Sequence, residues 1–134
     1  VGTAYYFPNI VSKNGGTGIL TKAIALCTTT ALTPRITLYL YKRIPTANLN
    51  DNAANTGVLT ADRADYVGRL DFAAMQDLGG NSESILVPGD LGMPLEFVCD
   101  SENNSLWGIA VTRDAITGEA AAMQLMFKLF AREG

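Results

Sequence analysis

The first candidate for chemistry is a glycine-rich loop with a nearby lysine, NGGTGILTK at residues 14–22. A loop that cradles phosphate requires a glycine, four residues and then Gly-Lys-Ser/Thr at the start of a helix. Here Gly18 is followed by Ile19, and Lys22 comes four residues after Gly18. The residues that follow have the composition of a strand, so no helix N-terminus faces an anion. We therefore interpret the glycines as a turn that leads into a β-strand.

Acidic and amide side chains provide the next candidates. Two carboxylates can hydrolyse a glycosidic bond only if they lie about 5 to 10 Å apart across a cleft, which the sequence does not fix. A loop of oxygen ligands suits calcium, but the spacing of an EF-hand is absent, and Asp and Asn are ordinary turn formers. We predict no metal site and no cofactor. The residues considered are Asp62 and Asp65 in one polar stretch and Asp100, Glu102, Asn103 and Asn104 in one short loop.

The sequence lacks the residues and motifs on which nucleophilic catalysis usually depends. The chain has no histidine, which removes the commonest general base and metal ligand. No G-x-S-x-G motif or C-x-x-C pair is present. Cys27 and Cys99 lie in apolar runs, where we expect two buried free thiols, with a disulfide as the alternative that only geometry can decide. We predict that the protein is not an enzyme.

Length and composition indicate one domain, residues 1–134, with an unusually uncharged surface. Charged residues make up 17% of the chain, against about 25% in ordinary soluble domains. We therefore expect a partner to cover part of the surface. The net charge of −3 argues against a nucleic-acid partner, and no apolar run approaches the ~20 residues of a membrane span.

The clearest strand pattern is RITLYLYKRI at residues 35–44. Aliphatic residues alternate with polar and aromatic residues, which is the pattern of a strand with one buried face. Prolines flank the stretch on both sides, where their missing N–H groups cost little. The inward set is Ile36, Leu38 and Leu40, and the outward set is Arg35, Thr37, Tyr39, Tyr41 and Arg43.

Seven other segments have a weaker strand pattern, and a helix is the alternative for the second of them. Glycine-, proline- and asparagine-rich turns separate the segments, and long helices do not alternate with them. This spacing favours an all-β fold, an antiparallel β-sandwich of about eight strands, and specifically a jelly roll. The segments are residues 4–7, 19–28, 66–72, 84–87, 95–99, 106–112 and 123–130.

Period-two alternation also predicts which side chains share a face. We expect three such sets in addition to that of residues 35–44. They are Leu20, Ile24 and Leu26 on one face, Tyr66, Leu70 and Phe72 inward, and Trp107 in the core with Ile109 and Val111.

Two outward faces have the composition of protein interfaces. Tyr39 and Tyr41, flanked by Arg35 and Arg43, combine the residue types that are enriched at such contacts. The alternative is that these tyrosines pack on a neighbouring strand or on the polar stretch at residues 46–65.

The closing strand is apolar on both faces, which the interior of one sandwich does not require. We expect a partner chain to bury one of the faces. One face carries Met123, Leu125, Phe127 and Leu129, and the other carries Met126 and Phe130.

Three stretches resemble a group of small tailed-phage virion proteins, the capsid decoration or cement proteins. They are GGTGILTKAIAL, TPRITLYLYKRIPTANLNDNAA and TADRADYVGRLDF. Together with the apolar closing strand, the similarity covers most of residues 14–130. The shared motifs are structural and include no catalytic residues.

The resemblance implies a β-sandwich or jelly-roll subunit, often trimeric, that sits on an assembled capsid and clamps neighbouring shell subunits. Its partners would be the major capsid protein or other virion subunits, with no nucleic acid or membrane, and its location would be the virion, assembled in the host cytoplasm. The alternative function is a carbohydrate-binding or fibre-tip module. That module would use Trp107 or the tyrosines as a stacking platform and the loop at residues 100–104 for a metal.

Overall fold

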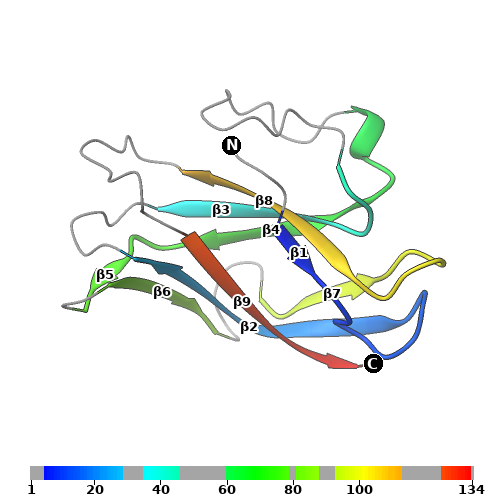
Figure 1. Cartoon of the computed structure of the whole chain (residues 1–134), viewed down its shortest axis with the longest axis horizontal. Coiled ribbons are helices and arrows are strands. Elements are labelled where there is room, and N and C mark those ends of the chain that lie inside the picture. The colour runs from blue at the N-terminus through cyan, green and yellow to red at the C-terminus, as the bar shows by residue number, and fades with distance from the viewer. Residues whose placement is uncertain are drawn as a thin grey trace.

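The chain folds into two antiparallel β-sheets, as a computed structural model shows (Figure 1). The structure describes residues 5–28, 35–45, 60–78, 81–87, 93–112 and 125–133. These ranges contain nine strands and one short 3₁₀-helix, η1 (Thr60–Asp62). The predicted all-β, antiparallel fold is confirmed. The jelly-roll topology stays a prediction.

The first sheet has four strands, with β8 and β3 at its centre. Residues of β3 pair with β8 on one side and with β4 on the other. In order across the sheet, the strands are β1 (Tyr5–Phe7), β8 (Leu106–Thr112), β3 (Ile36–Tyr41) and β4 (Tyr66–Phe72).

The second sheet is built around one long strand, β2 (Thr17–Cys27). Two strands, β6 and β7, pair with successive parts of β2 along one side, and β9 pairs along the other side. The short β5 pairs with β6. Their bounds are β5 (Gln76–Asp77), β6 (Ser82–Leu86), β7 (Leu95–Val98) and β9 (Leu125–Glu133).

Alternate side chains of both sheets meet in one hydrophobic core, so the two sheets form a sandwich. Small residues of β2 and branched residues of the first sheet are buried together. The two cysteines are free and buried, as predicted, and burial raises the pKa of the Cys99 thiol. The core includes Leu20, Ala23 and Ala25 of β2 with Leu38, Leu40 and Leu70 of the first sheet.

A β-bulge in β2 reverses the faces that simple alternation predicts. The pairing with β9 shifts between Leu20 and Lys22, which adds one residue to β2. Leu20 therefore points into the core, whereas Ile24 and Leu26 lie on the outer face and are half-buried. The prediction that these three residues share a face is wrong.

A second bulge reorients the start of β4. Leu40 pairs with Gly68, but Tyr41 pairs with Tyr66, so one extra residue lies between the two pairs on β4. The bulge turns Tyr66 to the outer face, where it packs against Tyr41, while Leu70 stays in the core. The prediction that Tyr66 points inward is wrong, because a one-residue shift exchanges the two faces of a strand.

The glycine loop is a turn that leads into β2, as predicted. Gly15 has a φ of 71°, and its N–H group donates to the backbone oxygens of Asp100 and Asn103. Gly18 faces the buried Phe97 ring so closely that an added Cβ would lie 2.6 Å from Phe97 Cζ. The backbone groups and glycine positions of this loop thus serve internal packing.

Candidate interaction surfaces

The tyrosine face of β3 lies on the outside of the first sheet but is covered. Tyr39 is 8% exposed and Tyr41 is 1% exposed, and both pack in a small cluster with Ile109 and Val111. The Tyr66 ring centroid lies 5.7 Å from that of Tyr41. The tyrosines thus pack on a neighbouring strand, which is the alternative that the sequence left open. A role for Tyr39 and Tyr41 in a protein interface stays a prediction.

The environment of Tyr41 keeps its phenol neutral. Burial, together with a smaller contribution from the nearby carboxylate of Asp62, raises the pKa of Tyr41 to about 12. A neutral phenol at physiological pH fits packing better than acid–base chemistry, because a catalytic group works best with a pKa near the operating pH.

Of the two predicted interface arginines, Arg43 is held by an acidic loop. Its Nε lies 2.9 Å from Asp100 Oδ1 and 3.9 Å from Asp65 Oδ1. The hydrogen bond from Arg43 lowers the pKa of Asp100, whose other oxygen accepts from the backbone N–H of Glu102. Arg43 therefore joins the end of β3 to the loop before β8. Arg35 is exposed just before β3.

The polar side chains of the loop at residues 100–104 form hydrogen bonds within the chain. Asn103 Nδ2 donates to the Lys42 carbonyl, and Asn104 Nδ2 donates to the carbonyl of Val11. Throughout the described ranges, no group of three or more acidic or sulfur ligands could hold a metal ion. The loop thus acts as a brace between strands.

Trp107 lies on the outer face of the first sheet, next to an exposed tyrosine. It shares that face with Ile109 and Val111 as predicted, but the main core lies on the opposite face, so the predicted core position is wrong. Its ring centroid is 5.1 Å from that of Tyr6, which is 57% exposed. The two rings form a small aromatic platform.

The closing strand β9 shows the alternation that the sequence predicts. Met126 is 47% exposed and Phe130 is 44% exposed, whereas Leu125, Phe127 and Leu129 pack against the core. Met123, which the sequence pattern places on the same face as Leu125, lies outside the described residues.

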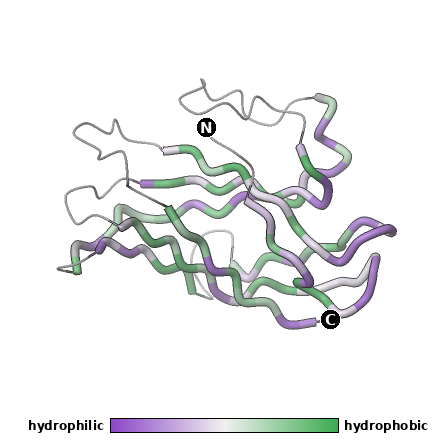
Figure 2. The backbone as a smooth tube through the Cα atoms, in the orientation of Figure 1, coloured by the Kyte–Doolittle hydropathy of each residue, from purple (hydrophilic) through white to green (hydrophobic). Residues whose placement is uncertain are grey.

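Strand register places further apolar side chains beside Met126 and Phe130. Across the sheet, Leu26 pairs with Met126, and Ile24 pairs with Ile85. Ile85 is 43% exposed, and the green of hydrophobic residues in Figure 2 follows β2, β6 and β9 with purple breaks. We call this surface the β6–β2–β9 face; it comprises Lys22, Ile24, Leu26, Glu83, Ile85, Val87, Met126, Lys128 and Phe130.

This face combines exposed apolar side chains with local positive charge. Two lysines and one glutamate interrupt its apolar residues, although the whole chain has a net charge of −3. The ammonium group of Lys22 lies 5.3 Å from the centroid of the Phe130 ring, within reach of a cation–π interaction. The face therefore offers apolar area together with two cationic side chains.

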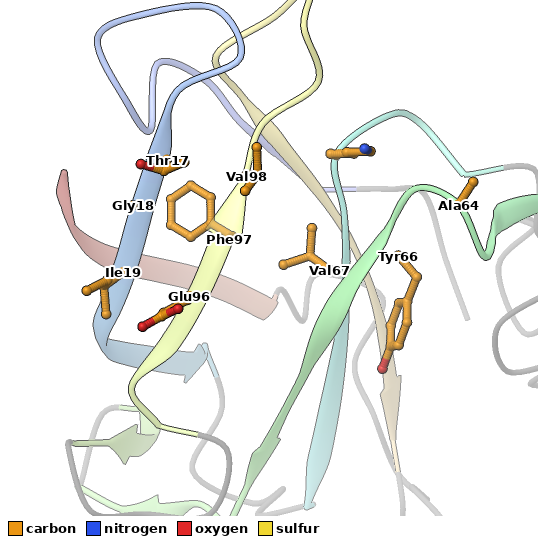
Figure 3. A pocket seen from close by; sticks show the side chains of 10 residues that line it. Thr17, Gly18, Ile19, Ala64, Tyr66, Val67, Glu96, Phe97 and Val98 are labelled. Atoms are coloured by element: carbon orange, nitrogen blue, oxygen red, sulfur yellow. The ribbon is translucent and has the colours of Figure 1, made fainter. Parts of the chain in front are cut away.

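A cleft of about 660 Å³ opens between the two sheets beside β4 and β7 (Figure 3). Val67 lies on one side of the cleft, and Phe97 and Val98 lie on the other. Lys42 and Glu96 are the charged side chains of its lining, and no nucleophile is paired with a base there. This cleft could not be predicted from the sequence, because β4 and β7 belong to different sheets.

Comparisons with known proteins gave no match. No family model matches the chain, and no curated protein or solved structure is significantly similar to it. The resemblance to decoration proteins therefore stays a prediction that rests on the sequence motifs. In the part of the chain that the structure describes, no helix has the length and hydropathy needed to cross a membrane.

Proposed function

We propose that this protein is a non-catalytic structural subunit that binds another protein through the β6–β2–β9 face. The observation that carries the proposal is the gathering of Ile85, Val87, Met126 and Phe130, each between 43% and 47% exposed, on one outer face. Large exposed apolar patches on a folded domain mark sites of association. The low share of charged residues, 17%, supports the same conclusion.

The partner that we propose is the assembled shell of a tailed phage, through its major capsid protein or another virion subunit. The support is the resemblance of three sequence stretches to decoration proteins, together with a fold of the expected class. A specific contact typically buries about 1,600 Å² in total. An outer sheet face suits such a contact, because its side chains are held by strands.

The direct test is co-sedimentation of the purified protein with empty heads of the phage that carries the gene. Replacing Ile85 with aspartate puts a charge among the apolar side chains of the face, and we expect binding to weaken roughly tenfold or more. The matched control is Ile44→Asp, at a residue that is 63% exposed and lies just beyond β3. Equal binding of both variants, or no binding by the wild type, would contradict the proposal.

A second candidate function rests on the Tyr6–Trp107 platform. Aromatic rings on an exposed surface can stack on sugars, so the platform supports a carbohydrate-binding module. A glycan array distinguishes the two functions. Sugar binding that is lost in Tyr6→Ala, with shell binding absent, would favour this candidate.

A further inference from the structure

The sheet edges of this sandwich differ in their protection against other strands. Natural proteins blunt exposed edges with short strands, charges, prolines or bulges. In the described residues, β1 and β5 are very short, β7 has four residues and follows Pro94, and β4 carries Arg69, Asp71 and a bulge. In contrast, β9 has nine residues and contains no glycine or proline, and its charged residues are Lys128, Arg132 and Glu133.

The outer edge of β9 presents backbone groups in a regular pattern. Within the described ranges, β9 pairs with β2 alone. The carbonyl of Phe130 accepts from Thr21 Oγ1 of β2, and the carbonyl of Leu125 accepts from Tyr5 Oη of β1. Because neighbouring residues of a strand direct their backbone groups to opposite sides, odd-numbered residues such as Leu129 direct theirs away from β2.

We propose that β9 pairs with β9 of a second copy of this chain, antiparallel, about a two-fold axis through Leu129. The pairing would join the second sheets of both copies into one continuous sheet. It goes beyond the proposed shell binding, because it uses the edge of the sheet and not its face.

The charges of β9 are compatible with this register and disfavour the two registers next to it. With the axis at Leu129, Lys128 lies opposite Phe130 of the second copy, and Met126 lies opposite Arg132. An ammonium group beside an aromatic ring is favourable, as for Lys22 and Phe130 within one chain. Moving the axis by one residue puts Lys128 opposite itself or opposite Arg132, and like charges directly opposite each other destabilise a strand pair.

Because β9 can pair with its own copy in this way, we choose a second copy of the chain as the partner strand. A two-fold pair uses the same surface on both subunits, and β9 fits its own copy without a like-charge contact. Both ends of β9 are also anchored, by Tyr5 at Leu125 and by the backbone N–H of Ser12, which donates to the Glu133 carboxylate. The pairing predicts a dimer, where the resemblance to decoration proteins implies a trimer.

The test is the mass of the protein in solution, measured by sedimentation equilibrium from micromolar to millimolar concentrations. We expect a dimer for the wild type. Ala131→Pro removes an outward N–H group from an edge strand, where proline is tolerated. Two hydrogen bonds are lost in the symmetric pair, so we expect the dimer to weaken roughly ten- to a hundredfold.

A charge-swap pair tests the register. Phe130→Lys places two like charges opposite each other and should weaken the dimer, and adding Lys128→Glu should restore it. Circular dichroism of each variant checks that the fold is intact. A monomeric or trimeric wild type, a dimer that Ala131→Pro leaves unchanged, or no rescue by Lys128→Glu would overturn the proposal.

Different variants test the shell-binding proposal and the dimer proposal, so either proposal can be refuted without the other. Ile85→Asp lies on β6, away from the edge of β9, so it should dimerise normally and lose shell binding. Ala131→Pro should dimerise weakly and keep the β6–β2–β9 face. Loss of both properties in Ile85→Asp would contradict the assignment of the dimer to the β9 edge.

Discussion

Replacing Leu40 with alanine is expected to lower the free energy of unfolding by about 3 kcal/mol. Leu40 is 0% exposed and lies in β3, which is paired on both sides, within the core that both sheets share. Removing its branched side chain leaves a cavity that the sheets can close only in part. Urea unfolding followed by circular dichroism measures the change.

The matched control is Leu78→Ala. Leu78 is 52% exposed, so the same chemical change should alter the free energy of unfolding by no more than about 0.5 kcal/mol. Similar losses in the two variants would mean that β3 does not lie between covered faces of a sandwich.

The second large effect is expected for Gly18→Ala, which should cost about 1–3 kcal/mol by overpacking. The new Cβ would lie 2.6 Å from Phe97 Cζ and 3.2 Å from Val11 Cγ1. Phe97 is 4% exposed, so its ring cannot move into solvent without losing burial. Thermal or urea unfolding measures the loss.

A double-mutant cycle assigns this cost to its cause. In a Phe97→Ala background, the clashing ring atoms are gone, and Gly18→Ala should cost much less than in the wild type. An equal cost in both backgrounds would contradict the packing role of Gly18. The same result would reopen the question of what the glycine loop does.

Period-two alternation found the strands but could not find the bulges. The pattern of residues 35–44 fixes β3, because aliphatic and polar residues alternate there without interruption. The bulge in β2 adds Thr21, an ordinary strand-forming residue that carries no signal, whereas the bulge in β4 lies next to Gly68, and a glycine within a strand pattern is a weak signal of a bulge. Each bulge exchanges the faces on one side of it, and this accounts for the wrong faces of Ile24, Leu26 and Tyr66.

Only part of the β6–β2–β9 face could be predicted, because strand register, which the sequence does not show, decides which side chains are exposed. Met126 and Phe130 could be found because β9 carries apolar residues on both faces, and one sandwich core can cover a single face. The burial of Tyr39 and Tyr41 could not, because it depends on neighbours such as Tyr66 that only strand register brings together. Ile85 was missed because its outward direction follows from the pairing of β6 with β2.

Oxidation of methionine tests the central claim, that the β6–β2–β9 face is the contact surface. Met126 is 47% exposed, whereas Met75 is 4% exposed and Met93 is 7% exposed, so the latter two serve as internal controls. Oxidation of a methionine follows its exposure to the oxidant. Peroxide treatment followed by mass spectrometry should show fast oxidation of Met126 in the free protein and strong protection on phage shells, with Met75 and Met93 slow in both. Equally fast oxidation of Met126 in the shell-bound protein would contradict the account.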